Sequence, residues 1–75
     1  MKMKLFMIVT ASTYYGARGY PVALVGGVWS VAQSGYRGQI VRFRTREAAE
    51  RIRKSFPRPA DFRVRELVAA RGAGS

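Results

Sequence analysis

The N-terminal half of the chain spaces its apolar residues as strands do. Residues 3–10 (MKLFMIVT) are apolar at nearly every position except Lys4, which is typical of a central strand covered on two sides or paired on both edges. Residues 12–21 (STYYGARGYP) bring two glycines and three tyrosines, and they predict a long aromatic loop or a wide hairpin connection. The pattern therefore begins with one strand and a loop, and nothing in it favours a helix.

The segment VALVGGVWSVA, residues 22–32, has two interpretations. Gly26 and Gly27 could form the centre of a tight hairpin, because both central positions of such a turn need positive φ. They could instead form a bulge in one bent strand. Since each flank is rich in valine and carries Leu24 or Trp29, we expect the hairpin. Residues 33–39 then predict a second loop punctuated by glycine.

The rhythm changes within VRFRTREAAERIRK, residues 41–54. Residues 40–44 alternate apolar side chains with arginine and predict a strand, and Thr45 is a suitable N-cap for a helix. The helix should end near Phe56, because Pro57 and Pro59 disfavour helical backbone before them. On its surface Glu47 and Arg51 are spaced to form an ion pair, as are Glu50 and Lys54.

Residues 61–68 (DFRVRELV) fit either a strand or a short helix capped by Asp61. We expect the strand, because it would pair with residues 3–10 and enlarge a thin core. The sequence thus predicts an α+β fold: a small antiparallel sheet of three or four strands with one α-helix packed on one face, in the order β-β-(β)-β-α-β. Residues 1–68 form a single domain and residues 69–75 a disordered tail. Core positions are expected at Trp29, Phe43, Ile52, Phe56 and Phe62.

Charge adds the next constraint. The 75 residues include 14 Lys and Arg against 4 Asp and Glu, a formal net charge of +10, and such a field favours acidic partners. Without Cys or His the chain lacks disulfides, the common zinc ligands and histidine-dependent nucleophiles. The N-terminal MKMKLFMIVTAS superficially resembles a signal peptide, but it has no clear cleavage site for one. Its apolar run is also too short to span a membrane. We therefore expect a cytoplasmic protein that does not bind membranes.

Four arginines form the leading candidate site. If both alternating segments are strands of one sheet, Val41, Phe43, Phe62 and Val64 face the helix. The arginines then stand on the other face, and neither strand carries an Asp or Glu on that side to relieve their repulsion. The alternative is an ordinary solvated sheet surface. The four residues are Arg42, Arg44, Arg63 and Arg65.

The two loops hold further candidates, because tyrosine beside Arg and Gly is a combination found in proteins that bind single-stranded nucleic acid. Tyrosine can stack on a base while arginine holds phosphate. The alternative is that glycine makes the turns and tyrosine shields the edge of the core. The loop candidates are Tyr14, Tyr15, Arg18, Tyr36 and Arg37.

Other known chemistries fit poorly. RGQIVRF, residues 37–43, is a near miss to the RNP1 motif, but Gln39 and Val41 stand about where stacking aromatics are needed. The acidic residues have basic partners nearby or no helper for catalysis. We expect no enzymatic activity, no metal and no cofactor.

The run FRTREAAERIRK, preceded by GGVW and followed by a short final strand, resembles a class of very small phage and mobile-element proteins that includes several anti-CRISPR inhibitors. One departure is Ala48, where members often carry Glu. The resemblance implies a stoichiometric, non-catalytic inhibitor of a nucleoprotein complex such as a CRISPR effector, in the host cytoplasm if phage-encoded. The alternative is an accessory protein that binds DNA or RNA. A homodimer is a third hypothesis, because so small a core gains from a second copy.

Overall fold

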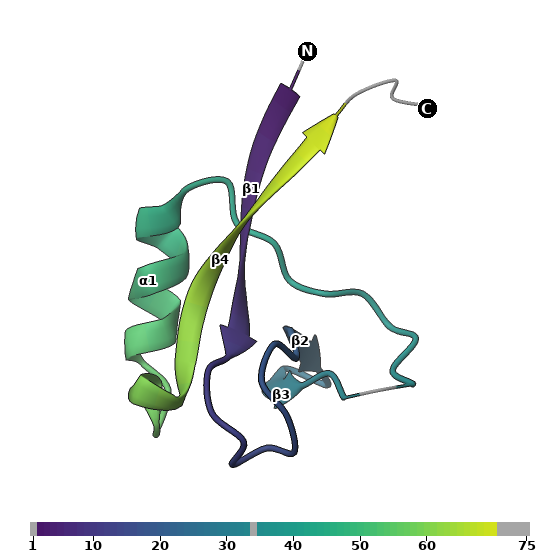
Figure 1. Cartoon of the computed structure of the whole chain (residues 1–75), viewed down its shortest axis with the longest axis vertical. Helices are drawn as coiled ribbons and strands as arrows, with labels where there is room; N and C mark the ends of the chain where they lie inside the picture. The colour runs from purple at the N-terminus through teal and green to yellow at the C-terminus, as the bar shows by residue number, and fades with distance from the viewer. Residues whose placement is uncertain (1, 34, 71–75) are drawn as a thin grey trace.

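The computed structural model describes residues 2–33 and 35–70, and it has the predicted α+β class. Four strands, one α-helix and one turn of 3₁₀-helix make up the fold, and α1 lies beside the crossing pair of β1 and β4 (Figure 1). The elements in chain order are β1 (Lys2–Thr10), β2 (Val22–Val25), β3 (Val28–Val31), α1 (Arg46–Lys54), η1 (Pro59–Asp61) and β4 (Phe62–Ala70).

The longest pairing joins the two ends of the chain. β1 and β4 are antiparallel over nine residues each, from Lys2 opposite Ala70 to Thr10 opposite Phe62. The prediction of a strand at residues 61–68 is therefore confirmed. This segment pairs along its length with β1, and a short helix would lack that pairing. β4 continues to Ala70, two residues past the predicted domain boundary. The predicted disordered tail otherwise lies in residues 71–75, outside the described residues.

The tight hairpin at Gly26 and Gly27 is also confirmed. Both glycines have positive φ, of 59° and 82°, and β2 pairs antiparallel with β3 around them. Residues with side chains rarely adopt such angles at two successive positions, so the Gly-Gly pair itself specifies this turn.

The prediction of one continuous sheet is wrong in its detail. The strands form two two-stranded sheets, β1–β4 and β2–β3. The predicted strand at residues 40–44 is reduced to one isolated bridge, between Phe43 and Phe6. The reason is that a second segment also uses that edge of β1: Val9 forms a bridge with Pro21, and the amide of Val41 bonds to Val22 of β2 instead of to β1.

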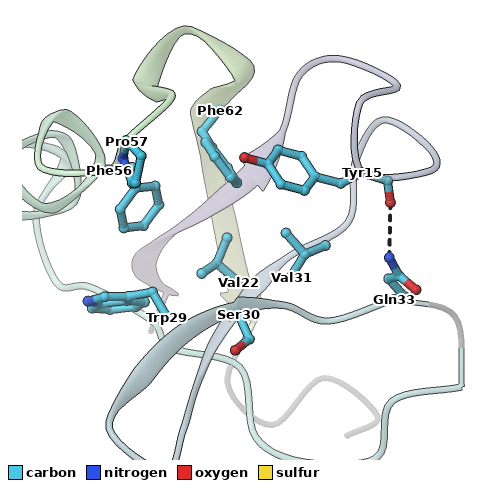
Figure 2. A pocket seen from close by; sticks show the side chains of 9 residues that line it. All are labelled: Tyr15, Val22, Trp29, Ser30, Val31, Gln33, Phe56, Pro57 and Phe62. Atoms are coloured by element: carbon cyan, nitrogen blue, oxygen red, sulfur yellow. Dashed lines mark hydrogen bonds between the residues drawn. The ribbon is translucent and has the colours of Figure 1, made fainter.

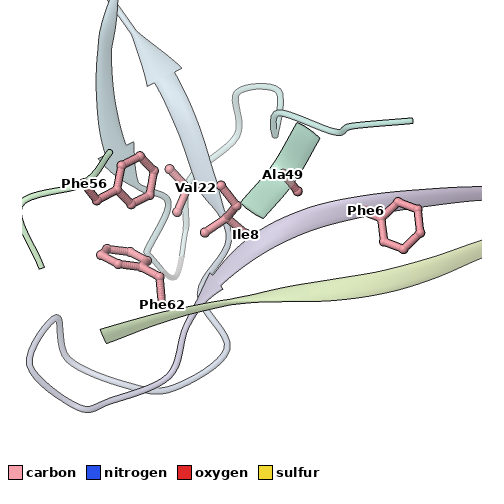
Figure 3. Close-up of a cluster of buried hydrophobic side chains, with 6 residues drawn as sticks. All are labelled: Phe6, Ile8, Val22, Ala49, Phe56 and Phe62. Carbon is pink, nitrogen blue, oxygen red and sulfur yellow. The ribbon is translucent and has the colours of Figure 1, made fainter. Parts of the chain in front are cut away.

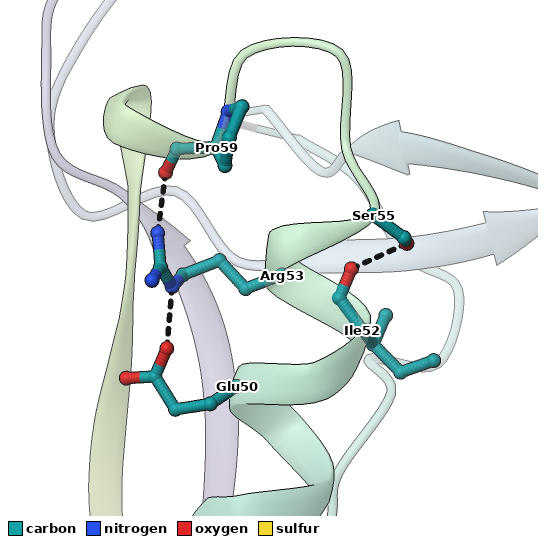
Figure 4. Close-up of polar contacts among 5 residues, drawn as sticks. All are labelled: Glu50, Ile52, Arg53, Ser55 and Pro59. Atoms are coloured by element: carbon teal, nitrogen blue, oxygen red, sulfur yellow. Dashed lines mark hydrogen bonds and ion pairs between the residues drawn. The ribbon is translucent and has the colours of Figure 1, made fainter.

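The helix begins as predicted at Thr45, whose hydroxyl accepts a hydrogen bond from the Ala48 amide at 3.1 Å. It ends at Lys54, with Ser55 as C-cap and its hydroxyl donating to the Ile52 carbonyl (Figure 4).

The predicted surface ion pairs of the helix are not those observed. Glu50 accepts a bond from Arg53 at 2.7 Å, and not from Lys54. Arg53 also donates to the Pro59 carbonyl at 2.7 Å, so the tertiary contact with η1 selects this partner (Figure 4). Among the described residues no ion pair joins Glu47 to Arg51.

The core lies between α1, the β1–β4 pair and the hairpin. Of the predicted core residues, Phe56 and Phe62 are buried, while Trp29, Phe43 and Ile52 are half-buried and pack against them. Aromatic rings supply much of the packing, with ring centres 4.9 Å apart for Phe56 and Phe62. The buried cluster consists of Phe6, Ile8, Val22, Ala49, Phe56 and Phe62 (Figure 3).

Thr10 is the buried polar residue that ties the first loop to β1. It is fully buried, and its hydroxyl donates to the Ala17 carbonyl at 2.7 Å while accepting from the Tyr20 amide at 3.0 Å. A buried hydroxyl with both roles filled costs little to bury and fixes the course of the chain around it.

Candidate functional site

The register of β1 and β4 places two of the candidate arginines on one face. Arg65 lies opposite Met7 and Arg63 opposite Val9, whereas Val64 lies opposite Ile8, which belongs to the buried cluster. Since successive residues of a strand point to opposite faces, Arg63 and Arg65 are on the face away from α1, as predicted.

The bridge at Phe43 brings the other two arginines to the same face. Phe43 is paired directly with Phe6, so its side chain shares the side of β1 that packs on the helix. From this bridge we infer that its neighbours Arg42 and Arg44, which lie outside the named strands, point the other way, beside Met7 and Leu5 of β1. We call this surface the arginine face, defined by Arg42, Arg44, Arg63 and Arg65.

All four side chains are exposed, and in the part of the chain that the structure describes none of them has an ion-pair partner. Residues two apart in a strand are about 6.7 Å apart, and the two flanking segments are about 10 Å apart across β1. Four cations therefore occupy a patch no larger than a few residues in each direction.

The four acids of the chain all lie elsewhere. Glu66 is opposite Phe6 on the helix side of the sheet, where it is 3.7 Å from both Lys4 and Arg46. Glu47 and Glu50 belong to α1, and Asp61 belongs to η1. The face opposite the helix therefore carries positive charge with no acidic residue to compensate it.

Of the loop candidates, Tyr15 has a packing role. Its ring centre is 5.1 Å from that of Phe62, and its carbonyl accepts a hydrogen bond from the Gln33 side chain at 3.1 Å. Because Phe62 faces the helix side, Tyr15 is not brought to the arginine face.

Tyr14 is 65% exposed, but one face of its ring is already occupied. The guanidinium of Arg58 lies 4.0 Å from the centre of the Tyr14 ring. The ring of Tyr15 packs against the Tyr14 ring in an edge-on arrangement. Arg58 also donates to Asp61, and this hydrogen bond raises the pKa of the guanidinium above its usual value. Arg58 was not among the predicted site residues, and the only signal for it in the sequence was the spacing of Arg58 and Asp61.

Arg18 is exposed in the first loop, and no described contact joins it to the arginine face. Arg37 is likewise exposed, next to Tyr36 in the second loop. These two arginines stay predictions without a defined place in the site.

Tyr36 lies beside a shallow hollow of about 320 Å³ that is mostly apolar. Its ring rests against Gly38, where even a Cβ atom would collide with it, and its hydroxyl is 3.5 Å from the Gln39 carbonyl. Ile40 lines the same hollow and precedes Arg42 by two residues, so the hollow adjoins the arginine face. The other lining residues are Tyr20, Pro21, Ala32, Gln33 and Gly38.

A second hollow, of about 350 Å³, opens on the helix side between the hairpin and the aromatic core (Figure 2). Trp29 and Phe56 form part of its wall, and the Gln33 to Tyr15 hydrogen bond lies at one end. It contains no charged residue, and it is separated from the arginine face by the sheet. It lies among the side chains Tyr15, Val22, Trp29, Ser30, Val31, Gln33, Phe56, Pro57 and Phe62.

The tip of the hairpin is apolar and exposed. Leu24, Val25 and Val28 are 48%, 50% and 64% exposed, and no residue from Gly19 to Tyr36 is charged. In a chain of net charge +10 this is an unusually neutral stretch.

Within residues 2–33 and 35–70 no group of three or more His, Cys, Asp or Glu could hold a metal ion. No helix among these residues has the length and apolar character needed to cross a membrane.

No protein-family model matches this chain, and comparison with curated proteins and with solved structures gave no significant match.

Proposed function

We propose that this chain is a non-enzymatic binding protein whose arginine face holds the phosphates of nucleic acid, either free or within a nucleoprotein complex. The observation that supports this proposal is the grouping of Arg42, Arg44, Arg63 and Arg65 on one face that has no acidic residue. Guanidinium groups suit this role, because their planar fork donates two parallel hydrogen bonds to a phosphate.

A merely solvated surface would be arranged differently. Elsewhere in the molecule the acids are used to pair cations, as at Glu50 with Arg53 and at Glu66 with Lys4. On the arginine face Arg63 and Arg65 lie two residues apart on one strand, with no acid on that face to offset their repulsion. A polyanionic partner would remove that repulsion and release its own counterions on binding.

A matched pair of double variants tests the site. R42Q/R65Q and R51Q/K54Q each remove two positive charges, but only the first pair lies on the arginine face; Arg51 and Lys54 are exposed on α1. Binding of a random oligonucleotide is measured by fluorescence anisotropy between about 50 and 200 mM salt. Loss of two phosphate contacts should reduce the slope of log affinity against log salt by about 1.4 for a single strand and about 1.8 for a duplex.

We expect that reduction for R42Q/R65Q and a much smaller one for R51Q/K54Q. Equal losses in the two variants would show that net charge alone drives binding, against a defined site. Absence of binding by the wild-type chain at low salt would rule out nucleic acid as a direct partner.

A second candidate function is stoichiometric inhibition of a nucleoprotein complex such as a CRISPR effector, as the resemblance implies. The observation that favours it is the neutral, exposed apolar tip at Leu24, Val25 and Val28, a surface suited to protein and not to phosphate. The chain would then contact both components of such a complex.

The test is titration of this chain into target-DNA cleavage by purified, guide-loaded CRISPR effectors of several types. Inhibition that is complete near one copy per complex, that depends on Val28 and that responds weakly to salt supports this function. Inhibition that appears only when the chain is in excess over the DNA would contradict it and indicate sequestration of the substrate.

A further inference from the structure

The arginine face has an apolar centre. Met7 of β1 lies between Arg42 on one side and Arg65 on the other, and Leu5 lies opposite Leu67 of β4. These three apolar side chains are half-buried, so each keeps part of its surface open to solvent. The face is therefore a strip of apolar groups with cations along both sides.

α1 packs on the other face of β1 and β4, whereas on the arginine face full burial is reached at Val9, at one end of the strip. β1 is the strand that the sequence shows to be apolar on both faces, and on the arginine face the fold buries Val9 completely but leaves Leu5 and Met7 half-buried. A partner that touches the arginines would also have to touch Met7 and Leu5.

The hollow beside Tyr36 extends the apolar strip at one end. Ile40 lines this hollow and stands on the same side of its segment as Arg42, two residues further on. Tyr36 is 39% exposed and presents aromatic surface to this hollow. A volume of about 320 Å³ can admit one flat ring system of the size of a nucleobase.

We propose that the arginine face prefers single-stranded nucleic acid to duplex, with unpaired bases on the Met7 strip and one base in the hollow beside Tyr36. This inference rests on the proposed function. A duplex presents phosphates and sugars to a flat protein surface and keeps its bases stacked inside, so the apolar strip would meet no apolar partner. A single strand offers base faces to apolar and aromatic side chains while its phosphates reach the arginines.

The test compares one 20-nucleotide sequence as a single strand and as a blunt duplex, at a fixed low salt concentration, by fluorescence anisotropy. We expect the single strand to bind about tenfold more tightly or better. Y36S should weaken single-strand binding about tenfold and change duplex binding less than about twofold, whereas Y36F should retain the wild-type preference.

M7Q tests the strip in the same way, and we expect it to weaken single-strand binding more than duplex binding. V28Q is the matched control, an apolar-to-polar change on the hairpin tip that should alter neither. Should M7Q not fold, as judged by circular dichroism, the Tyr36 variants decide the question alone, since Tyr36 lies in an exposed loop. Equal or tighter binding of the duplex would overturn this inference and leave the proposed function standing. Equal effects of Y36S on both forms would overturn it too, whereas failure to bind either form would overturn the proposed function itself.

Discussion

Phe6 and Phe43 exchange two backbone hydrogen bonds, of 2.8 Å from the Phe6 amide and 2.7 Å from the Phe43 amide. This single bridge replaces a whole predicted strand, yet it is enough to orient its neighbours. With Phe43 turned toward the core, Arg42 and Arg44 must point to the opposite face, where Arg63 and Arg65 already lie. The candidate site thus depends on one long-range contact.

Truncation of Phe43 should therefore be costly for so small a protein. Its half-buried ring packs against Trp29 with ring centres 6.4 Å apart, and we expect F43A to lose about 2 kcal/mol, roughly half of what a fully buried Phe loses. Urea unfolding followed by Trp29 fluorescence measures this. F43L is the control, because it keeps most of the buried volume; a loss in F43L as large as that in F43A would contradict the packing explanation.

The hydroxyl of Thr10 should matter more than its methyl group. T10V keeps the shape but leaves the Tyr20 amide and the Ala17 carbonyl without a partner, at a cost of about 1–3 kcal/mol. T10S keeps both hydrogen bonds and should lose less. Chemical denaturation ranks the two variants, and hydrogen exchange at the Tyr20 amide should accelerate in T10V only. The opposite ranking would show that apolar contacts hold the loop.

The N-cap of α1 gives a local prediction. T45A removes the acceptor of the Ala48 amide and should destabilise the protein by about 1 kcal/mol. T45S and T45D, which retain a capping oxygen, should stay within a few tenths of a kcal/mol of the wild type. Thermal unfolding monitored at a helix-sensitive wavelength provides the measurement, and an unchanged midpoint in T45A would mean that tertiary packing alone fixes the start of the helix.

The turn of the β2–β3 hairpin can be tested by changing the glycines separately. Gly26 has φ of 59°, and a Cβ added there would meet no atom within 4 Å, so the cost of substitution is conformational and not steric. G26N should be nearly neutral, because Asn-Gly is a favoured pair for this turn, whereas G26V should lose about 1–2 kcal/mol. Urea unfolding of the two variants measures the difference. Similar stabilities for G26N and G26V would show that the turn tolerates another geometry.

Local patterns determined much of this fold. Gly26 and Gly27 specified the hairpin because few residues adopt two successive positive φ angles, and Thr45 specified the start of α1 because its hydroxyl fills an otherwise unpaired amide. The alternation of Arg63 and Arg65 with apolar residues predicted both β4 and the face on which these arginines stand. Each of these signals lies within a few residues of the feature that it specifies.

Tertiary contacts decided the rest. Only the fold showed that Pro21 and Phe43 share one edge of β1, that Arg53 reaches Pro59 and so takes Glu50 from Lys54, and that Arg58 covers the ring of Tyr14. Such outcomes are competitions between partners distant in sequence, and their small free-energy differences depend on geometry that no local pattern contains. The sequence therefore determined which residues could form the arginine face, and the packing of the chain around β1 decided that four of them share it.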